Sequence, residues 1–408
     1  MKLKNPGSTI SRRDLLGYGG ALAIGHTMLA DISEAATNPA RSVEDRGSAI
    51  RITKLEATPV NPKVLVKITT NQGIFGWGEI SNLNAEVAAT MVRSLFELLD
   101  GQNPTRIEHI WQRLYRSAER NARDGAYTVH AISAIDMALW DIAGKLYGVP
   151  VYRLLGGPTR DRIRVYNTPQ ARKISPGGPQ PFAGTTAEID AVVNRVKEAR
   201  EKLGPEGALM MDLHCCIPPP FLFQLAAKIE QYDLMFLEEP VAYGNIEVYK
   251  RLKQQIRIPL ATGEKDRTIY GVLPYLINNC IDILQPDCAF VGGISQMKKI
   301  ATLAEPFHVP LAPHCTTTEL GMTASFHATA SIPHFLIHEG NPPDRRLPGV
   351  THKTWTVDDE GYASLPEGPG LGIEVDEAAL AKRAAEPRSK GGRQPGPLDE
   401  HDGSVVDY

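Results

Sequence analysis

Six short apolar segments between residues 208 and 339 each end in an ionisable residue, and these ends recur at a regular spacing. The six end residues are Asp212, Glu238, Glu264, Asp287, His314 and Glu339. Neighbouring ends stand 23 to 27 residues apart, which is about the length that a strand, a helix and two loops need. Parallel strands joined in this way close into a βα barrel whose strand ends face one mouth, where active sites lie. The spacing therefore predicts a barrel with ionisable side chains around one opening.

Three of these residues predict a cation site. Asp212, Glu238 and Glu264 follow three neighbouring predicted strands. Converging acids repel one another unless a hard cation lies between them, and oxygen ligands from separate strands suit Mg²⁺. For Glu238 alone, an ion pair at a strand end is the plainer interpretation, since Glu239 and Pro240 follow it. The triplet favours the metal.

Two histidines predict proton transfer beside this cation. Asp287 and His314 belong to the next two strands, and an acid beside a histidine fixes its tautomer and raises its basicity. His214 lies two residues beyond Asp212 and so faces the same side. A metal flanked by two histidines suits removal of a proton α to a carboxylate. The metal stabilises the enediolate, one histidine takes the proton, and the other protonates a leaving hydroxyl.

The sequence before the barrel predicts a smaller α+β domain. Residues 50–80 alternate like strands, with a turn signal at 71–73, and helical spacing follows at 87–99 and 129–146. Residues 350–376 return to a strand-like pattern that we expect to complete this cap. The predicted divisions are a cap at 50–160, a barrel at 161–345, a return to the cap at 346–385 and a flexible tail at 386–408.

The first 35 residues resemble a twin-arginine export signal. Arg12 and Arg13 precede a weakly apolar run from 17 to 30, and small residues flank Glu34 before a cleavage point. An amphipathic helix with two solvated arginines is the alternative. The signal predicts transit through the twin-arginine machinery, a flexible segment at 36–49, and a periplasmic or otherwise exported protein.

Composition excludes several classes of protein. The 408 residues carry a net charge of −3, which gives no basic field for nucleic acid, and no run of about 18 apolar residues predicts a membrane span. Five cysteines without a C-x-x-C pair argue against a disulfide framework or a cysteine zinc site. Cys215, Cys216 and Cys315 adjoin the two histidines. The metal site already explains this pattern, so a nucleophilic role is disfavoured, while a disulfide near the mouth stays open.

At this point the sequence resembles a known family. The matching segments are Asp212-Leu213-His214, Glu238-Glu239-Pro240, Ala261 to Glu264, Gln285-Pro286-Asp287 with Gly292-Gly293-Ile294, Ala312 to Cys315, and Ala131 to Asp141. They are similar to the enolase superfamily, in its mandelate racemase/muconate lactonizing enzyme family, and especially to the acid-sugar (galactonate-type) dehydratases. The similarity covers roughly residues 50–380.

This resemblance implies an α/β fold and a set of roles. The fold is a modified TIM barrel of the enolase type, with an N-terminal α+β capping domain that the C-terminal segment completes. Mg²⁺ would bind Asp212, Glu238 and Glu264. Asp287 and His314 would form the base dyad, Glu339 would lie near the substrate carboxylate, and His214 would be the general acid. Relatives commonly form homo-oligomers, so we expect one here.

One region departs from the family pattern. Only 45 residues separate Asn167 from Asp212, whereas two βα units need about 50, and one helix, opened by a Thr185–Glu188 capping box, is recognisable there. Residues 169–184 show no strand pattern. The sequence therefore predicts that the second barrel strand and the first barrel helix are missing. The Lys-x-Lys base that racemizing relatives carry on that strand is not visible either.

The sequence thus predicts a sugar-acid hydro-lyase. The expected reaction is dehydration of an aldonate-type acid to a 2-keto-3-deoxy acid. Two alternatives remain: a racemase or epimerase acting on a carboxylate substrate, with His214 as the second base, and a non-catalytic sugar-acid binder with a shortened barrel.

Overall fold

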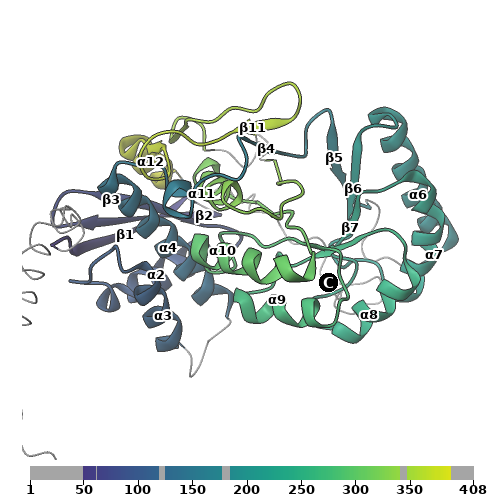
Figure 1. Cartoon of the computed structure of the whole chain (residues 1–408), viewed down its shortest axis with the longest axis horizontal. Coiled ribbons are helices and arrows are strands. Elements are labelled where there is room, and N and C mark those ends of the chain that lie inside the picture. Colours follow the sequence, from purple (N-terminus) through teal and green to yellow (C-terminus); the bar gives the residue numbers. More distant parts are fainter. Residues whose placement is uncertain (1–48, 61, 119–124, 177–183, 341–346, 387–408) are drawn as a thin grey trace, which may run out of the picture. The chain divides into compact units, whose positions relative to one another are not determined.

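A computed structural model describes residues 49–60, 62–118, 125–176, 184–340 and 347–386, and residues from 49 onward form one unit. The predicted signal peptide and nearly all of the two predicted flexible segments lie outside the described residues. Figure 1 shows the strands of the cap in purple and the parallel strands of the barrel in teal. No helix within the described ranges is long and apolar enough to cross a membrane.

The cap is built on a three-stranded antiparallel sheet. Its strands are β1 (Ile52–Val60), β2 (Lys63–Thr70) and β3 (Phe75–Ile80). Helices α2 (Ala85–Ser94), α3 (Ile107–Ala118) and α4 (Ala126–Tyr147) follow. Two glycines let α4 approach β3 closely, because a Cβ at Gly76 or Gly78 would lie 2.0 or 1.9 Å from a backbone carbonyl oxygen of α4. The period-2 and period-3.6 patterns therefore gave the right kinds of element here.

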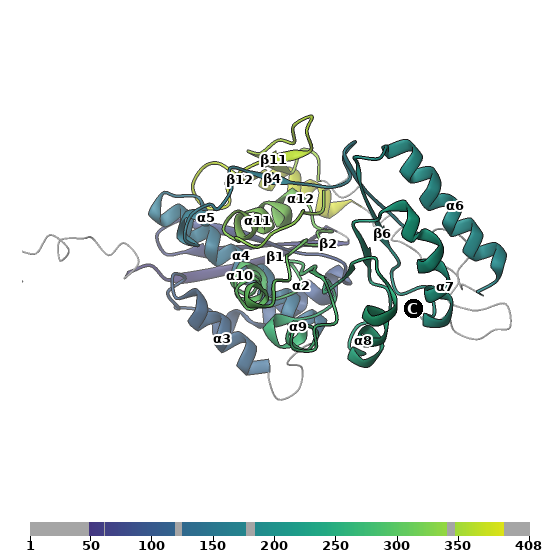
Figure 2. The ribbon, with the colours of Figure 1, turned by 45° about the vertical axis from the view of Figure 1, so that its right-hand side comes forward.

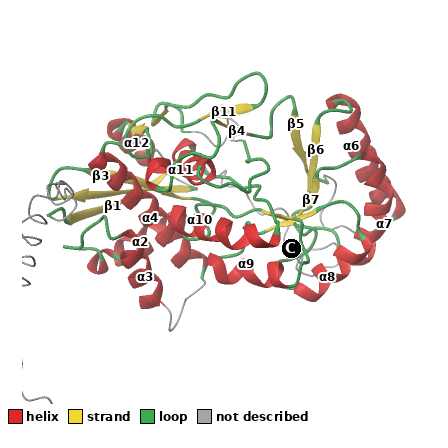
Figure 3. Cartoon of the chain, in the orientation of Figure 1, coloured by secondary structure: helices red, strands yellow, loops and turns green. Residues whose placement is uncertain are grey.

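The barrel wall is a parallel sheet in the order β5-β6-β7-β8-β9. The strands are β5 (Ala171–Ile174), β6 (Ala208–Asp212), β7 (Phe236–Glu238), β8 (Leu260–Thr262) and β9 (Ile283–Leu284). Single parallel bridges at Leu311, Phe335 and His338 continue the wall to Val165. The helices between them are α6 (Thr186–Leu203), α7 (Pro219–Ile229), α8 (Ile246–Gln255), α9 (Thr268–Ile277), α10 (Gly293–Ala304) and α11 (Glu319–Ala330). Figure 3 shows α6 and α7 beside the yellow strands β5 to β7.

The modified barrel with its cap is confirmed, but one detail of the prediction was wrong. Residues 171–174 form β5, which pairs in parallel with β6 from Ala171↔Ala208 to Ile174↔Met211. The predicted loss of the first helix is correct, because the described residues 165–171 contain no helix. The chain reverses at Asn167, whose φ is 63°, and the Thr168 amide donates to the Ala171 carbonyl. The strand escaped prediction because it has only four residues, two of them cationic.

The C-terminal segment runs beside both parts of the chain. Its elements are β10 (Thr351–Lys353), β11 (Tyr362–Ser364), β12 (Ile373–Val375) and α12 (Glu377–Ala385). Strand β11 pairs with β4 (Arg162–Arg164), which follows the short helix α5 (Val151–Leu154). Glu377 of α12 lies 2.5 Å from the Lys67 ammonium on β2, which links this segment to the cap. Figure 2, turned by 45°, shows α11 and α12 near these strands.

Candidate active site

The three predicted metal ligands lie at one edge of the parallel sheet. Asp212 is the last residue of β6, Glu238 is the last residue of β7, and the two are direct partners in the strand ladder. Glu264 follows β8 by two residues. All three are buried, with exposed fractions of 2%, 0% and 8%. Parallel strands end at the same edge, so the regular spacing of the sequence brings these acids together.

A lysine that sequence reasoning missed joins this group. The Lys173 Nζ on β5 lies 2.7 Å from Glu238 Oε1, 3.3 Å from Asp212 Oδ2 and 3.4 Å from Glu339 Oε1, and its side chain is 11% exposed. Ala171, two residues earlier, belongs to the small interior cluster of the barrel. Strand alternation therefore turns Lys173 inward. Once β5 is recognised as a strand, this alternation is the signal that identifies the lysine.

The charges of this cluster act strongly on one another. Burial, followed by the neighbouring Asp212, raises the pKa of Glu238 well above its ordinary value. Burial acts in the same direction on Asp212, but the hydrogen bond from His214 and the Lys173 ammonium lower the pKa of Asp212 below its ordinary value. Gln285 Nε2 donates to the second oxygen of Glu238 at 2.8 Å. Glu238 is thus partnered by one ammonium and one amide, and Asp212 by the same ammonium and by His214.

The predicted dyad is formed. His314 Nδ1 lies 2.7 Å from Asp287 Oδ2, while His314 Nε2 lies 3.2 Å from Glu264 Oε2 and 3.7 Å from Glu339 Oε2. The Glu264 contact lacks hydrogen-bond geometry, so this buried oxygen has no hydrogen-bond partner among the described residues. Burial acts to lower the pKa of His314, but the Glu264 and Glu339 carboxylates outweigh it and raise the pKa to about 10.

His214 contacts the cluster from the turn that directly follows β6. Its Nε2 lies 2.7 Å from Asp212 Oδ2, and its side chain is 50% exposed. His214 and Cys215 both have positive φ, at 46° and 59°, so the chain turns sharply just after Asp212. Such a conformation is uncommon for residues other than glycine and clusters at functional sites. All seven predicted site residues therefore belong to one network of contacts, with Lys173 as the added member.

Three cysteines lie beside the histidines, and burial disfavours the thiolate form of two of them, Cys215 and Cys315. Within the described residues, Cys215, Cys216 and Cys315 form no disulfide. Burial raises the pKa of Cys215 to about 12 and that of Cys315 to about 12. Because the thiolate is the nucleophile, these raised values disfavour a nucleophilic role. The Cys315 amide instead donates to Glu339 Oε2 at 2.8 Å, which helps to orient that carboxylate.

The donor set suits a divalent cation in its chemistry. Within the described residues, no three His, Cys, Asp or Glu side chains are arranged closely enough to hold an ion as they lie. The Lys173 ammonium contacts two of the three predicted ligands. The third offers Glu264 Oε2, a buried oxygen that lies 3.2 Å from His314 Nε2 but accepts no hydrogen bond within the described residues. Buried polar atoms are normally hydrogen-bonded or bound to an ion, so this oxygen fits a ligand role. Asp212, Glu238 and Glu264 would supply the oxygen atoms that Mg²⁺ requires.

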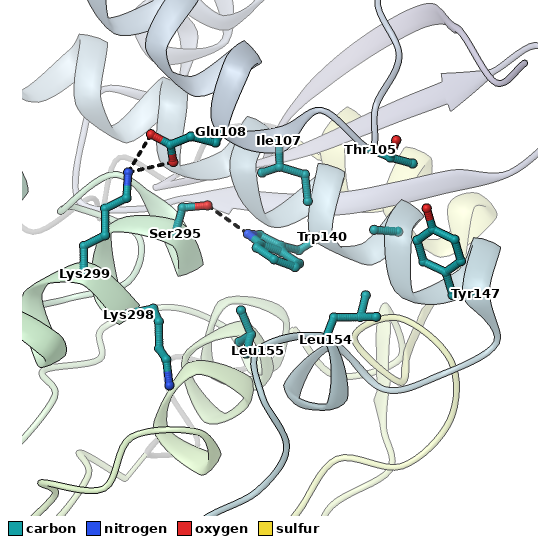
Figure 4. A pocket seen from close by; sticks show the side chains of 11 residues that line it. Thr105, Ile107, Glu108, Trp140, Tyr147, Leu154, Leu155, Ser295, Lys298 and Lys299 are labelled. Atoms are coloured by element: carbon teal, nitrogen blue, oxygen red, sulfur yellow. Dashed lines mark hydrogen bonds and ion pairs between the residues drawn. The ribbon is translucent and has the colours of Figure 1, made fainter. Parts of the chain in front are cut away.

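The junction of cap and barrel holds a separate hollow. It has a volume of about 530 Å³ and is lined by residues of α3, α4, α5 and α10 (Figure 4). Trp140 donates to the Ser295 hydroxyl at 2.9 Å, and Lys299 pairs with Glu108 at 2.6 Å. Lys298 donates to the carbonyl of Ser331. The Trp140–Ser295 and Glu108–Lys299 contacts join the cap to the barrel, and none of the predicted site residues lines this hollow.

Two family models cover almost all of the described chain. The mandelate racemase/muconate lactonizing enzyme N-terminal domain matches residues 49–156, and the enolase C-terminal domain-like model matches residues 161–379. The chain belongs to the mandelate racemase/muconate lactonizing enzyme family. The predicted resemblance, including that to the acid-sugar dehydratases, is thereby confirmed.

Individual relatives of this family agree over most of their length. The chain is 34% identical over 366 residues to the D-galactonate dehydratase of Ralstonia pickettii, covering 83% of this chain and 95% of that one. It is 33% identical over 388 residues to the D-galactonate dehydratase of Variovorax paradoxus, with 88% and 100% coverage. Among solved structures, the 3,6-anhydro-D-galactonate cycloisomerase of Zobellia galactanivorans has a TM-score of 0.74 and 31% identity, covering 82% of this chain and 99% of its own.

Proposed function

We propose that this family member is a Mg²⁺-dependent hydro-lyase that dehydrates an aldonate-type sugar acid to a 2-keto-3-deoxy acid. The observation that carries the proposal is the single network joining the three acids to the Asp287–His314 pair. The galactonate dehydratases of Ralstonia and Variovorax support the class of reaction. The cycloisomerase among the structural neighbours shows that other chemistry also occurs on this fold.

In this proposal His314 removes the C2 proton of the substrate. Asp287, at 2.7 Å, holds Nδ1–H and leaves Nε2 to accept that proton. Mg²⁺ on Asp212, Glu238 and Glu264 would supply the positive charge that stabilises the enediolate. The same charge would offset the Glu264 carboxylate, which raises the pKa of His314. Glu339 lies between the two cationic groups, with Oε2 at 3.7 Å from His314 Nε2 and Oε1 at 3.4 Å from Lys173 Nζ, and the Lys173 ammonium suits the substrate carboxylate.

His214 completes the reaction on the C3 side. It donates a proton to the departing hydroxyl, which leaves as water, and the resulting enol converts to the 2-keto-3-deoxy product. Its 2.7 Å contact with Asp212 orients the ring, and its half-exposed position lets it exchange protons with solvent. The two histidines thus handle one proton each, so the net change is the loss of one water.

Epimerization is a second candidate, and Lys173 is the observation that favours it. Lys173 Nζ and His314 Nε2 approach the two oxygens of Glu339 at 3.4 and 3.7 Å. An acid–base pair beside one carboxylate can remove a proton from one face of the substrate and return it on the other. Exchange of the C2 hydrogen for deuterium without loss of water would select this function over dehydration.

We further propose that the protein is exported through its twin-arginine segment and works in the periplasm as a homo-oligomer. The order of charged, apolar and small residues in 1–35 supports export. Cell fractionation of the full chain and of an Arg12→Lys/Arg13→Lys variant would test this. The wild type should be periplasmic and the variant cytoplasmic, and equal distribution would contradict it. Light scattering would give the mass of the assembly.

The test of function is a screen of the protein from Ala36 onward against aldonic and aldaric acids with Mg²⁺. Formation of a 2-keto-3-deoxy acid that EDTA abolishes supports the proposal. Solvent deuterium at C2 of recovered substrate, without product, supports epimerization instead. A folded protein that binds an acid and changes none would indicate a binder.

A further inference from the structure

The outer face of β5 differs from the rest of the barrel wall because no described helix precedes it. The chain passes from Tyr166 to Ala171 without a helix, so no helix between these described residues covers β5 beside α6. A hollow of about 680 Å³ occupies this place, lined by the residues after Val165, the outer side of β5 and the second half of α6. This hollow, which we call the β5 hollow, is lined by Thr168, Arg172, Lys173, Arg195, Glu198 and Lys202 among others.

The lining of the β5 hollow is strongly cationic. Arg172, Arg195 and Lys202 are exposed and line it together with one acid, Glu198. Arg195 donates to the Pro176 carbonyl at 3.3 Å. In the part of the chain that the structure describes, Arg172 and Lys202 have no hydrogen-bond or ion-pair partner. Concave surfaces with one sign of charge concentrate counter-ions and raise association rates by about 10- to 10³-fold.

The same strand connects this hollow to the candidate active site. Lys173 is among the residues that line the hollow, and its ammonium contacts Glu238, Asp212 and Glu339 inside the barrel. Strand β5 is the end of its sheet, since it pairs with β6 and has no other described partner. Lys173 is thus shared by the β5 hollow and the acid cluster.

We propose that the β5 hollow is a lateral access route for a carboxylate-bearing substrate, and that Arg172 and Lys202 attract the substrate there before it reaches the acid cluster. This inference rests on the proposed function, because it takes a sugar acid as the ligand. The loss of the first barrel helix then has a use, which is to open the wall at the strand that carries the inner ammonium.

The decisive experiment compares two pairs of charge neutralizations. Arg172→Gln/Lys202→Gln removes two cations from the hollow. The matched control, Lys197→Gln/Lys228→Gln, removes two exposed cations of α6 and α7 that do not line it. The association rate of D-galactonate is followed by stopped-flow tryptophan fluorescence at low and high salt. We expect the hollow pair to slow association about threefold to tenfold at low salt, less at high salt, with kcat unchanged.

An uncharged block gives an independent check. Ala199→Trp fills the hollow from α6 without altering charge and should also slow association while thermal unfolding stays cooperative. Equal rates in the hollow pair and the control pair would overturn the proposal, as would an unaffected rate in a folded Ala199→Trp protein. A wild-type protein that binds D-galactonate without turning it over would refute the proposed function. The association rates of the wild type and the two pairs of variants would still show whether the hollow attracts the acid.

Discussion

Strands β6 to β8 and strand β5 belong to one sheet but are held very differently. Each of β6, β7 and β8 has a neighbour on both sides, and the outward Leu209 of β6 is fully buried in the large core cluster. Among the described residues, strand β5 has one neighbour, and its outward residues are the exposed Arg172 and the half-buried Ile174. The well-covered strands carry the acids, whereas the edge strand carries the ammonium that partners them.

The site needs acids that are held rigidly and a positive charge that offsets them, and different strands provide the two. Acids that share a cation must be fixed closely, and strands packed on both edges provide that rigidity. The counter-charge from Lys173 comes from a four-residue strand that fewer interactions hold in place. We therefore expect substitutions on β6 to β8 and on the later strands to lower turnover or the free energy of unfolding. Substitution of Lys173 on β5 should instead remove the positive charge that offsets the buried acids.

The largest loss of turnover should come from a substitution of His314, which lies beyond β9 in the barrel wall. His314→Asn removes the proposed base while leaving Asp212, Glu238 and Glu264 intact. Turnover should fall by about 10²- to 10⁴-fold, the usual contribution of general base catalysis. The rise in melting temperature that Mg²⁺ produces should persist. Near-normal turnover would mean that another residue takes the proton, and Lys173 would be the next candidate.

The next effect should show how much the acids depend on β5. Lys173→Met leaves Glu238 and Asp212 without their ammonium partner, and removing one member of a buried ion pair costs about 3–5 kcal/mol. Urea unfolding in EDTA should show this loss. Lys265→Met removes a lysine from the buried acid Glu239, but Lys265 is more exposed, so the loss should be about 1 kcal/mol or less. A loss for Lys173→Met as small as that expected for Lys265→Met would mean that the Lys173 contacts contribute little to stability.

A third comparison sets the packing of the two regions against each other. Leu209→Ala on β6 opens a cavity in the core and should cost about 2–5 kcal/mol. Ile174→Ala on β5 removes a half-buried side chain next to the β5 hollow, so it should cost about 1 kcal/mol. Both values come from urea unfolding at one pH. A cost for Ile174→Ala that matches Leu209→Ala would show that β5 is as firmly packed as its neighbour.

The same contrast explains what the sequence could predict. The acids of β6 to β8 follow apolar runs at regular spacing, and topology alone brings such strand ends together. The convergence of Asp212, Glu238 and Glu264 and the pairing of Asp287 with His314 could therefore be predicted, while their roles stay predictions. Strand β5 has neither an apolar run nor a helix before it, and its pairing with β6 depends on contacts between segments far apart in the chain. Lys173 was missed for this reason, and the Gln285 contact with Glu238 likewise depends on side-chain packing.

The smallest predicted effect is a loss of stability at acidic pH that arises from His327 and does not involve β5. His327 is buried between the Tyr152 amide and the Leu371 carbonyl, where the barrel helix α11 meets α5 and the C-terminal segment. Burial lowers its pKa to about 4 from an ordinary value of 6.5. The unfolded chain then binds the proton more readily, so stability falls as the pH drops from 6.5 toward 4. Between pH 7 and 5.5 the loss from this one histidine should be about 1 kcal/mol.

The matched variants are His327→Gln and His109→Gln, the latter at an exposed position on α3. Urea unfolding at pH 7.0 and 5.5 should show a pH dependence smaller by that amount in His327→Gln and unchanged in His109→Gln. Combined with Lys173→Met, the His327 effect should add without coupling, since distant sites act independently. A clear departure from additivity would mean that β5 and the junction at His327 unfold as one cooperative unit, despite their different packing.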